Sequence, residues 1–110
     1  MNNQTRKRIF DAIQACLAIE QFTENTDFAS YMGNAMMRAA VERQLEIIGE
    51  ALNLATQADE ALAETLPEVR QIIGMRNRII HGYDNVDHMI IWDVVQAKIL
   101  PLRQSLERLL

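Results

Sequence analysis

The fold class is decided by Val41–Ala55, which reads VERQLEIIGEALNLA. Its apolar residues step alternately by four and three positions, the spacing that aligns side chains along one side of a helix. This first row consists of Val41, Leu45, Ile48, Leu52 and Ala55, and a second apolar row beside it consists of Ile47, Ala51, Leu54 and Ala58. One neighbouring helix could not cover so wide a surface. The stretch therefore predicts a helix buried against both an intramolecular core and a second copy of the chain, in a helical homodimer.

The composition fits a single helical domain spanning residues 1–110. A chain of 110 residues has the usual size of one domain. Hydrophobic residues make up 49% and charged residues 24%, which favours a packed core over disorder. Only four glycines and two prolines interrupt the chain, too few for the many turns of a β-sandwich or a barrel. We therefore expect an all-α fold.

The first half of the chain is predicted to hold two helices. Apolar residues from Ile9 to Leu17 recur at helical spacing before a polar stretch. Thr26 or Asp27 can cap the helix that follows, because their side-chain oxygens can accept from the free amides of a first turn. Residues 28–55 contain no proline, so we expect one long helix there.

The second half of the chain is predicted to add a short helical turn at Ala61–Glu64 and two longer helices. Pro67 suits the first turn of one helix, which Gly82 should end. Asp87 can cap the last helix, which Pro101 should kink because proline lacks an amide hydrogen. Together these segments predict a four- to five-helix up-and-down bundle.

Charge and hydropathy narrow the classes of function. The formal net charge is -4, so any contact with nucleic acid must use a local basic patch. No stretch approaches the roughly 18 consecutive apolar residues of a membrane span, and the polar start is unlike an export signal. The single cysteine, Cys16, sits among apolar positions and cannot form an intramolecular disulfide. We expect a cytoplasmic protein with a buried thiol, no membrane association and no bound metal.

Gly49 and Glu50 are unusual within the long helix. Glycine inside a helix costs about 1 kcal/mol relative to alanine, so Gly49 indicates that another backbone packs closely there, with a merely tolerated glycine as the alternative. With Glu50 it is assigned to an interface or structural role. Glu42, Glu46 and Glu50 lie four apart and form a row of like charge. Glu42 and Glu46 are interpreted as a solvated face.

Residues 76–84, RNRIIHGYD, concentrate the side chains that could perform chemistry. The pKa of an unperturbed histidine, about 6.5, lets His81 exchange protons near neutrality. Arginine offers a planar, permanently charged fork that matches phosphate. This pair suits cleavage of RNA by its own 2′-hydroxyl, in which a base removes a proton and a cation stabilises the added phosphate charge. Such a reaction needs no metal.

The spacing of these residues raises a geometric problem. Arg76 and His81 point about 140° apart on a straight helix, whereas Arg78 and His81 share a face. Arg76 would need a local kink or a symmetry-related chain to reach the same phosphate as His81. A composite site between two protomers solves this problem. The spacing alone leaves open that His81 is an ordinary histidine at a helix C-terminus.

The Arg76-x4-His81-x-Tyr83 string, with Asn77 after the arginine and Ile72-Ile73-Gly74-Met75 before it, resembles the signature of HepT-like toxins of the HEPN ribonuclease superfamily. Residues 40–51, AVERQLEIIGEA, resemble that family's second signature. The resemblance covers nearly the whole chain. It departs at Val69, where many members have tryptophan, and this departure concerns packing.

The resemblance implies a homodimeric, metal-independent endoribonuclease toxin that needs no cofactor. Arg76 and His81 would be its catalytic residues, in a cleft between protomers, with Asn77 and Arg78 supporting them. The implied partner is a small nucleotidyltransferase antitoxin, which silences the toxin by transferring AMP from ATP to Tyr83. Phosphate added there would occupy Arg76 and repel the RNA. A larger assembly of toxin and antitoxin is left open.

A second class of function also remains open at this point. The chain could be a non-catalytic helical partner of the nucleotidyltransferase that binds nucleotide or regulates it. That protein would bind nucleotide and the transferase without cleaving RNA. The presence of both Arg76 and His81 favours the ribonuclease, because a pure scaffold would need neither.

Overall fold

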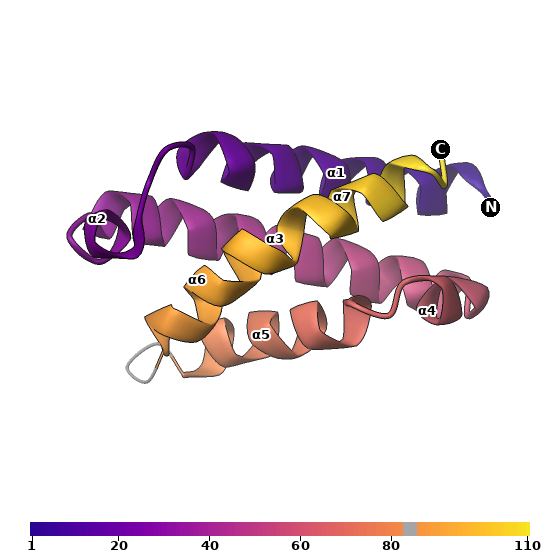
Figure 1. Ribbon diagram of the computed structural model, residues 1–110. Coiled ribbons are helices and arrows are strands. Elements are labelled where there is room, and N and C mark those ends of the chain that lie inside the picture. The colour runs from indigo at the N-terminus through magenta and orange to yellow at the C-terminus, as the bar shows by residue number, and fades with distance from the viewer. Residues whose placement is uncertain (83–85) are drawn as a thin grey trace.

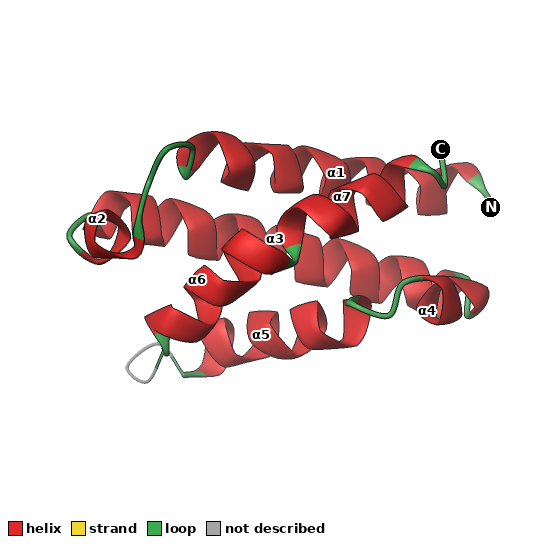
Figure 2. Cartoon of the chain, viewed as in Figure 1, coloured by secondary structure: helices red, strands yellow, loops and turns green. Residues whose placement is uncertain are grey.

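The computed structural model describes residues 1–82 and 86–110, except for the side chains of Ile80 and His81. Within this part every regular element is a helix, as Figure 2 shows. The helices are α1 (Asn3–Phe22), α2 (Phe28–Met32), α3 (Ala35–Ala58), α4 (Ala61–Thr65), α5 (Val69–His81), α6 (His88–Ala97) and α7 (Ile99–Glu107). The predicted all-α class is confirmed, but the described residues form seven helices where four or five were predicted.

Helix α3 lies at the centre of the molecule. It packs along α1 on one side and along α5 on the other, while α7 packs on α1 (Figure 1). The five residues of the first apolar row are at most 1% exposed. In the second row, Ala51 is buried, Ile47 and Leu54 are half-buried, and Ala58 is exposed. The same chain therefore covers much of the surface from which a dimer was inferred, and the homodimer stays a prediction.

The expectation of one helix over residues 28–55 was wrong, because a short break separates α2 from α3. Asp27 caps α2 through a bond from the Ser30 amide to its Oδ1, at 2.8 Å. Helix α2 ends after one turn, and Asn34 then starts a new helix by accepting from the Met37 amide at 3.0 Å. Gly33 and Asn34, neither of them a strong helix former, lie between the two helices.

The predicted kink in the last helix is a complete break between α6 and α7. Helix α6 ends at Ala97, and Lys98 lies between the two helices. Pro101 has no amide hydrogen to give to the Ala97 carbonyl, and its ring crowds that carbonyl. The break therefore falls where the proline removes the bond, and α7 continues from there over α1 (Figure 1).

Other predicted helix ends are confirmed. Oδ1 of Asp87 accepts from the amides of Met89, at 3.0 Å, and Ile90, at 3.3 Å, and so caps α6. Gly82 follows α5 and donates its amide to the Arg78 carbonyl at 2.8 Å. The short turn after Ala58 is α4. Pro67 precedes α5 by two residues and so lies outside its first turn.

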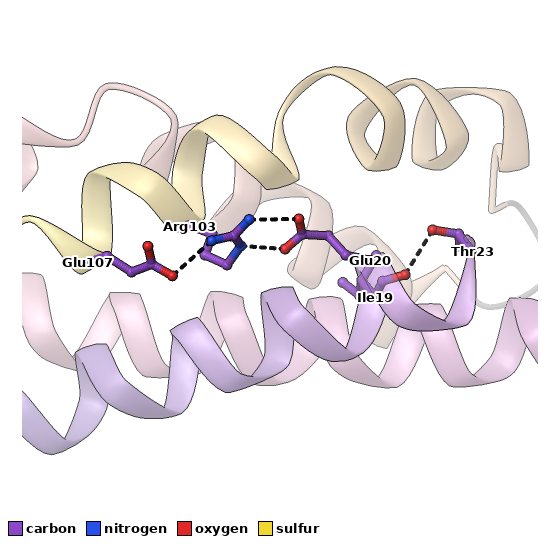
Figure 3. Close-up of polar contacts among 5 residues, drawn as sticks. All are labelled: Ile19, Glu20, Thr23, Arg103 and Glu107. Atoms are coloured by element: carbon purple, nitrogen blue, oxygen red, sulfur yellow. Dashed lines mark hydrogen bonds and ion pairs between the residues drawn. The ribbon is translucent and has the colours of Figure 1, made fainter. Parts of the chain in front are cut away.

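An ion-pair cluster that was not predicted from the sequence ties α7 to α1. Arg103 donates from Nε and Nη2 to both oxygens of Glu20, at 2.6 and 3.0 Å, and from Nη1 to Glu107 at 2.9 Å (Figure 3). One turn of α1 below Glu20 lies Cys16, which is fully buried as predicted. The described helices include none that is long and apolar enough to cross a membrane.

Candidate active site

Helix α5 carries the motif residues and is unbroken from Val69 to His81. The local kink that would bring Arg76 and His81 onto one face is therefore absent from this helix. Their backbone positions lie about 140° apart around its axis. The His81 side chain and all of Tyr83 fall outside the described residues, so their predicted roles stay predictions.

Arg76 lies directly against Gly49 of α3. A Cβ atom placed on Gly49 would sit 2.4 Å from the Arg76 Cβ and 2.8 Å from its Cγ. Real Cβ atoms do not approach other atoms this closely, so only glycine leaves room for the Arg76 stem. A close approach at Gly49 was expected and is present, but it is made by the first part of the Arg76 side chain and not by another backbone.

The guanidinium of Arg76 is half-buried and incompletely bonded. Its Nη1 donates to Oδ1 of Asn77 at 3.1 Å. Its Nε is buried and has no hydrogen-bond partner among the described residues. A buried N–H without an acceptor is costly, and the terminal N–H groups of the guanidinium can donate to an oxygen of a bound phosphate. The arrangement suits an anion site that also uses the neighbouring asparagine.

A pocket of about 570 Å³ opens on another face of α5, between it and α6. The described residues that line it include Asn77 and Arg78 together with Gly82, which directly follows His81. The structure therefore brings Asn77 and Arg78 to this pocket, while Arg76 lies on the side of α5 that faces α3. Asn77 connects Arg76 to the pocket, because it lines the pocket and accepts a hydrogen bond from Arg76.

Glu50 lies apart from this pocket, at the surface of α3. It is exposed and borders a smaller groove of about 300 Å³ between α1 and α3, where Arg8 and Asp11 also lie. No interface role is visible for it within one protomer, and its assignment stays a prediction.

Glu42 and Glu46 are half-buried, so they are less exposed than the interpretation as a solvated face predicted. Burial raises the pKa of Glu42, and the negative charge of Glu46 adds to this effect. The neighbouring His88 and Arg38 side chains lower that pKa and partly offset the burial. The start of α6, where His88 lies, is thus coupled electrostatically to α3.

Asp87 also belongs to this pocket. From the sequence it was predicted only as a helix cap. Asp87 lines the pocket together with Asn77 and Arg78. Asp87 follows His81 by six positions and caps another helix, so no helical spacing relates it to the motif. Asp87 reaches the pocket because the start of α6 borders it together with α5.

Comparison with known proteins places the chain in a family. The family model described as "Ribonuclease HepT-like" matches residues 12–109. A protein of Thermococcus cleftensis named "Probable ribonuclease HepT" is 31% identical over 109 residues, covering 99% of this chain and 98% of its own. A protein of Methanocaldococcus jannaschii whose name contains "RNase" is 30% identical over 101 residues, covering 90% of each chain. No solved structure matches.

The chain belongs to the HepT-like ribonuclease family.

Proposed function

We propose that the chain is a metal-independent endoribonuclease that cleaves RNA with Arg76 and His81. The observation that carries this proposal is the state of Arg76. Gly49 leaves room for its stem, Asn77 accepts from its Nη1, and its buried Nε has no partner among the described residues. Arg76 is thus a cation that can bind an anionic oxygen, and it lies five residues before His81.

The chemistry follows from the two side chains. Neutral His81 removes the proton from a 2′-hydroxyl, and the 2′-oxygen forms a bond to the adjacent phosphorus. The bond from phosphorus to the 5′-oxygen breaks, and that oxygen takes up a proton. Arg76 stabilises the extra negative charge on the phosphate oxygens during the attack. The products are a 2′,3′-cyclic phosphate and a 5′-hydroxyl, and no redox change occurs.

The active site is shared between two protomers in this proposal. Because α5 runs unbroken to His81, Arg76 and His81 of one chain do not share a face. Arg76 of one protomer and His81 of its partner would then act on the same phosphate.

Mixing two inactive variants tests the shared site. An Arg76→Ala chain paired with a His81→Ala chain contains one site with both residues intact. Random pairing of equal amounts should restore about a quarter of wild-type cleavage if the site is shared. If the site lies within one protomer, the mixture stays inactive. Arg70→Ala, which removes an exposed arginine from the same helix, is the matched control and should cleave normally.

The protein acts as a toxin in this proposal, silenced by a nucleotidyltransferase antitoxin that transfers AMP to Tyr83. The tyrosine oxygen would attack the α-phosphorus of ATP, with release of pyrophosphate and of the phenolic proton. The added phosphate would compete with RNA for Arg76 and Arg78. Co-expression with the transferase should add one AMP to the wild type, detected by mass spectrometry, and none to Tyr83→Phe. Growth inhibition that the transferase still relieves in Tyr83→Phe would contradict this mode of silencing.

A further inference from the structure

We propose that the pocket between α5 and α6 binds the base of an RNA nucleotide and prefers a base with an exocyclic amino group. The inference rests on the proposed ribonuclease function and assigns substrate recognition to this pocket. Its volume of about 570 Å³ lies within the usual range for small-molecule sites, roughly 300–1,000 Å³. A base with its ribose is a ligand of that scale.

The walls of the pocket suit a flat heterocycle. Met75, Ile79 and Ile91 are buried apolar residues that line it from the two helices. Ile90, which is 40% exposed, also lines it and offers an apolar surface that solvent can reach. Unstacked RNA bases are commonly held between apolar or aromatic side chains, with polar groups contacting their edges.

The polar lining indicates which base edge fits. Both hydrogen bonds that the described residues make to the Asp87 side chain go to Oδ1. Its other oxygen, Oδ2, is thus able to accept from a ligand, and an ionised carboxylate can only accept. Adenine, cytosine and guanine carry an amino group that can donate to it. The donor of uracil on this edge is N3–H, which lies between two carbonyl oxygens that a carboxylate repels.

Asn77 and Arg78 complete the recognition. Oδ1 of Asn77 already accepts from Arg76, which leaves the amide nitrogen to donate to a ring nitrogen or carbonyl of the base. Arg78 lines the same pocket and can hold the phosphate of the bound nucleotide. Because Gly82 of the lining follows His81 directly, the nucleotide would lie beside the reacting phosphate.

Binding can be measured without cleavage in full-length His81→Ala protein. The four ribonucleoside 3′-monophosphates are titrated separately, and the amide shifts of residues 75–79 and 90–91 are followed by NMR. We expect the adenine, cytosine and guanine nucleotides to bind about tenfold more tightly than the uracil nucleotide, since a carboxylate acceptor contributes a strong hydrogen bond. Equal affinities for all four, or shifts confined to other residues, would overturn the proposal.

Asp87→Asn in the same background tests the residue that selects the base. Asparagine also caps helices, so its Oδ1 can keep the bonds to Met89 and Ile90 while an amide donor replaces Oδ2. The preference over uracil should disappear in this variant. It should persist in Asp93→Asn, which removes the same charge from an exposed position on α6. An unchanged preference in Asp87→Asn would overturn the assignment.

The positions of the cuts separate this inference from the proposed function. Wild-type protein should cut RNA beside A, C or G more often than beside U, and Asp87→Asn should cut without that bias. If both proteins cleave RNA without a base preference, the proposed base pocket is overturned and the proposed ribonuclease function is still supported. Selective nucleotide binding by a protein that cleaves no RNA supports the pocket and overturns the ribonuclease.

Discussion

Gly49 of α3 faces the Arg76 side chain of α5 so closely that a Cβ on Gly49 would lie 2.4 Å from the Cβ of Arg76. The glycine belongs to the α3 motif and the arginine to the α5 motif, so the two motifs meet at this contact. The space at Gly49 determines where the stem of Arg76 lies, and hence where its guanidinium lies. The contact between Gly49 and Arg76 therefore both packs α3 against α5 and places the candidate catalytic cation.

Substituting Gly49 with alanine should damage both stability and activity. The added methyl must displace the Arg76 stem or separate α3 from α5, at a cost of about 1–3 kcal/mol. The gain in helix propensity, about 1 kcal/mol, offsets only part of this cost. We expect a lower Tm by calorimetry and a reduced kcat for RNA cleavage.

Gly74→Ala is the matched control on α5. A Cβ there meets nothing within 4 Å, so alanine should stabilise the helix by about 0.5–1 kcal/mol. Cleavage should be unchanged. If both glycine variants gain stability alike and Gly49→Ala cleaves normally, the contact with Gly49 does not determine the position of Arg76.

Arg103→Met should destabilise the fold by breaking the cluster that joins α7 to α1. Glu20 would lose two charge-assisted hydrogen bonds while remaining largely covered, at a cost of about 1–3 kcal/mol. Urea unfolding measures the loss. Lys7→Met breaks an exposed pair with Asp11 and should change stability by at most about 1 kcal/mol. Equal effects of the two variants would show that the Arg103 cluster contributes no more than a surface pair.

Glu42→Gln should make stability less dependent on pH. Burial raises the pKa of Glu42, so the folded state keeps a proton that the unfolded chain has lost. Stability therefore falls as pH rises from the ordinary glutamate pKa through the raised one. The variant should gain stability over the wild type near pH 7 and lose this advantage at about pH 4. Thermal unfolding across this range measures it.

Glu24→Gln supplies the control for Glu42, since it removes the same charge from an exposed residue. Its stability relative to the wild type should vary less over the same pH range. A Glu42→Gln advantage that is equal at both ends of the range would contradict the role given to burial.

The Cys16 thiol should resist alkylation in the folded protein. Burial, and to a lesser extent the charge of Glu20, raises its pKa to about 12, so little reactive thiolate forms at neutral pH. Iodoacetamide should modify it slowly in buffer and rapidly in urea above the unfolding transition. Mass spectrometry follows both rates. Equally rapid modification in buffer would contradict the burial.

The helical class and much of the core could be predicted from the sequence because apolar spacing reports directly on the buried face of a helix. The first row of α3 is buried as expected. The break at Gly33 was missed because the absence of proline was taken as continuity, whereas Asn34 can start a new helix by capping it. The Arg103 and Glu20 pair joins residues 83 positions apart, and no local pattern records such a contact.

The candidate site could be predicted in part. Gly49 indicated a close approach because glycine inside a helix needs a reason, but helix spacing could not identify Arg76 as the neighbour. The motif pointed to Asn77 and Arg78, and both line the pocket. Asp87 was recognised only as a cap, because its place in the pocket depends on where the start of α6 lies relative to α5.

Cleavage of mixed cellular RNA by purified, unmodified protein in the presence of excess chelator tests the central claim most directly. His81→Ala, purified in parallel, controls for contaminating nucleases, and mass spectrometry establishes that Tyr83 carries no AMP. We expect the wild type to cut RNA with the chelator present, leaving cyclic phosphate ends, and the variant to cut none. Equal cleavage by both proteins, or an inactive wild type with unmodified Tyr83, would contradict the account.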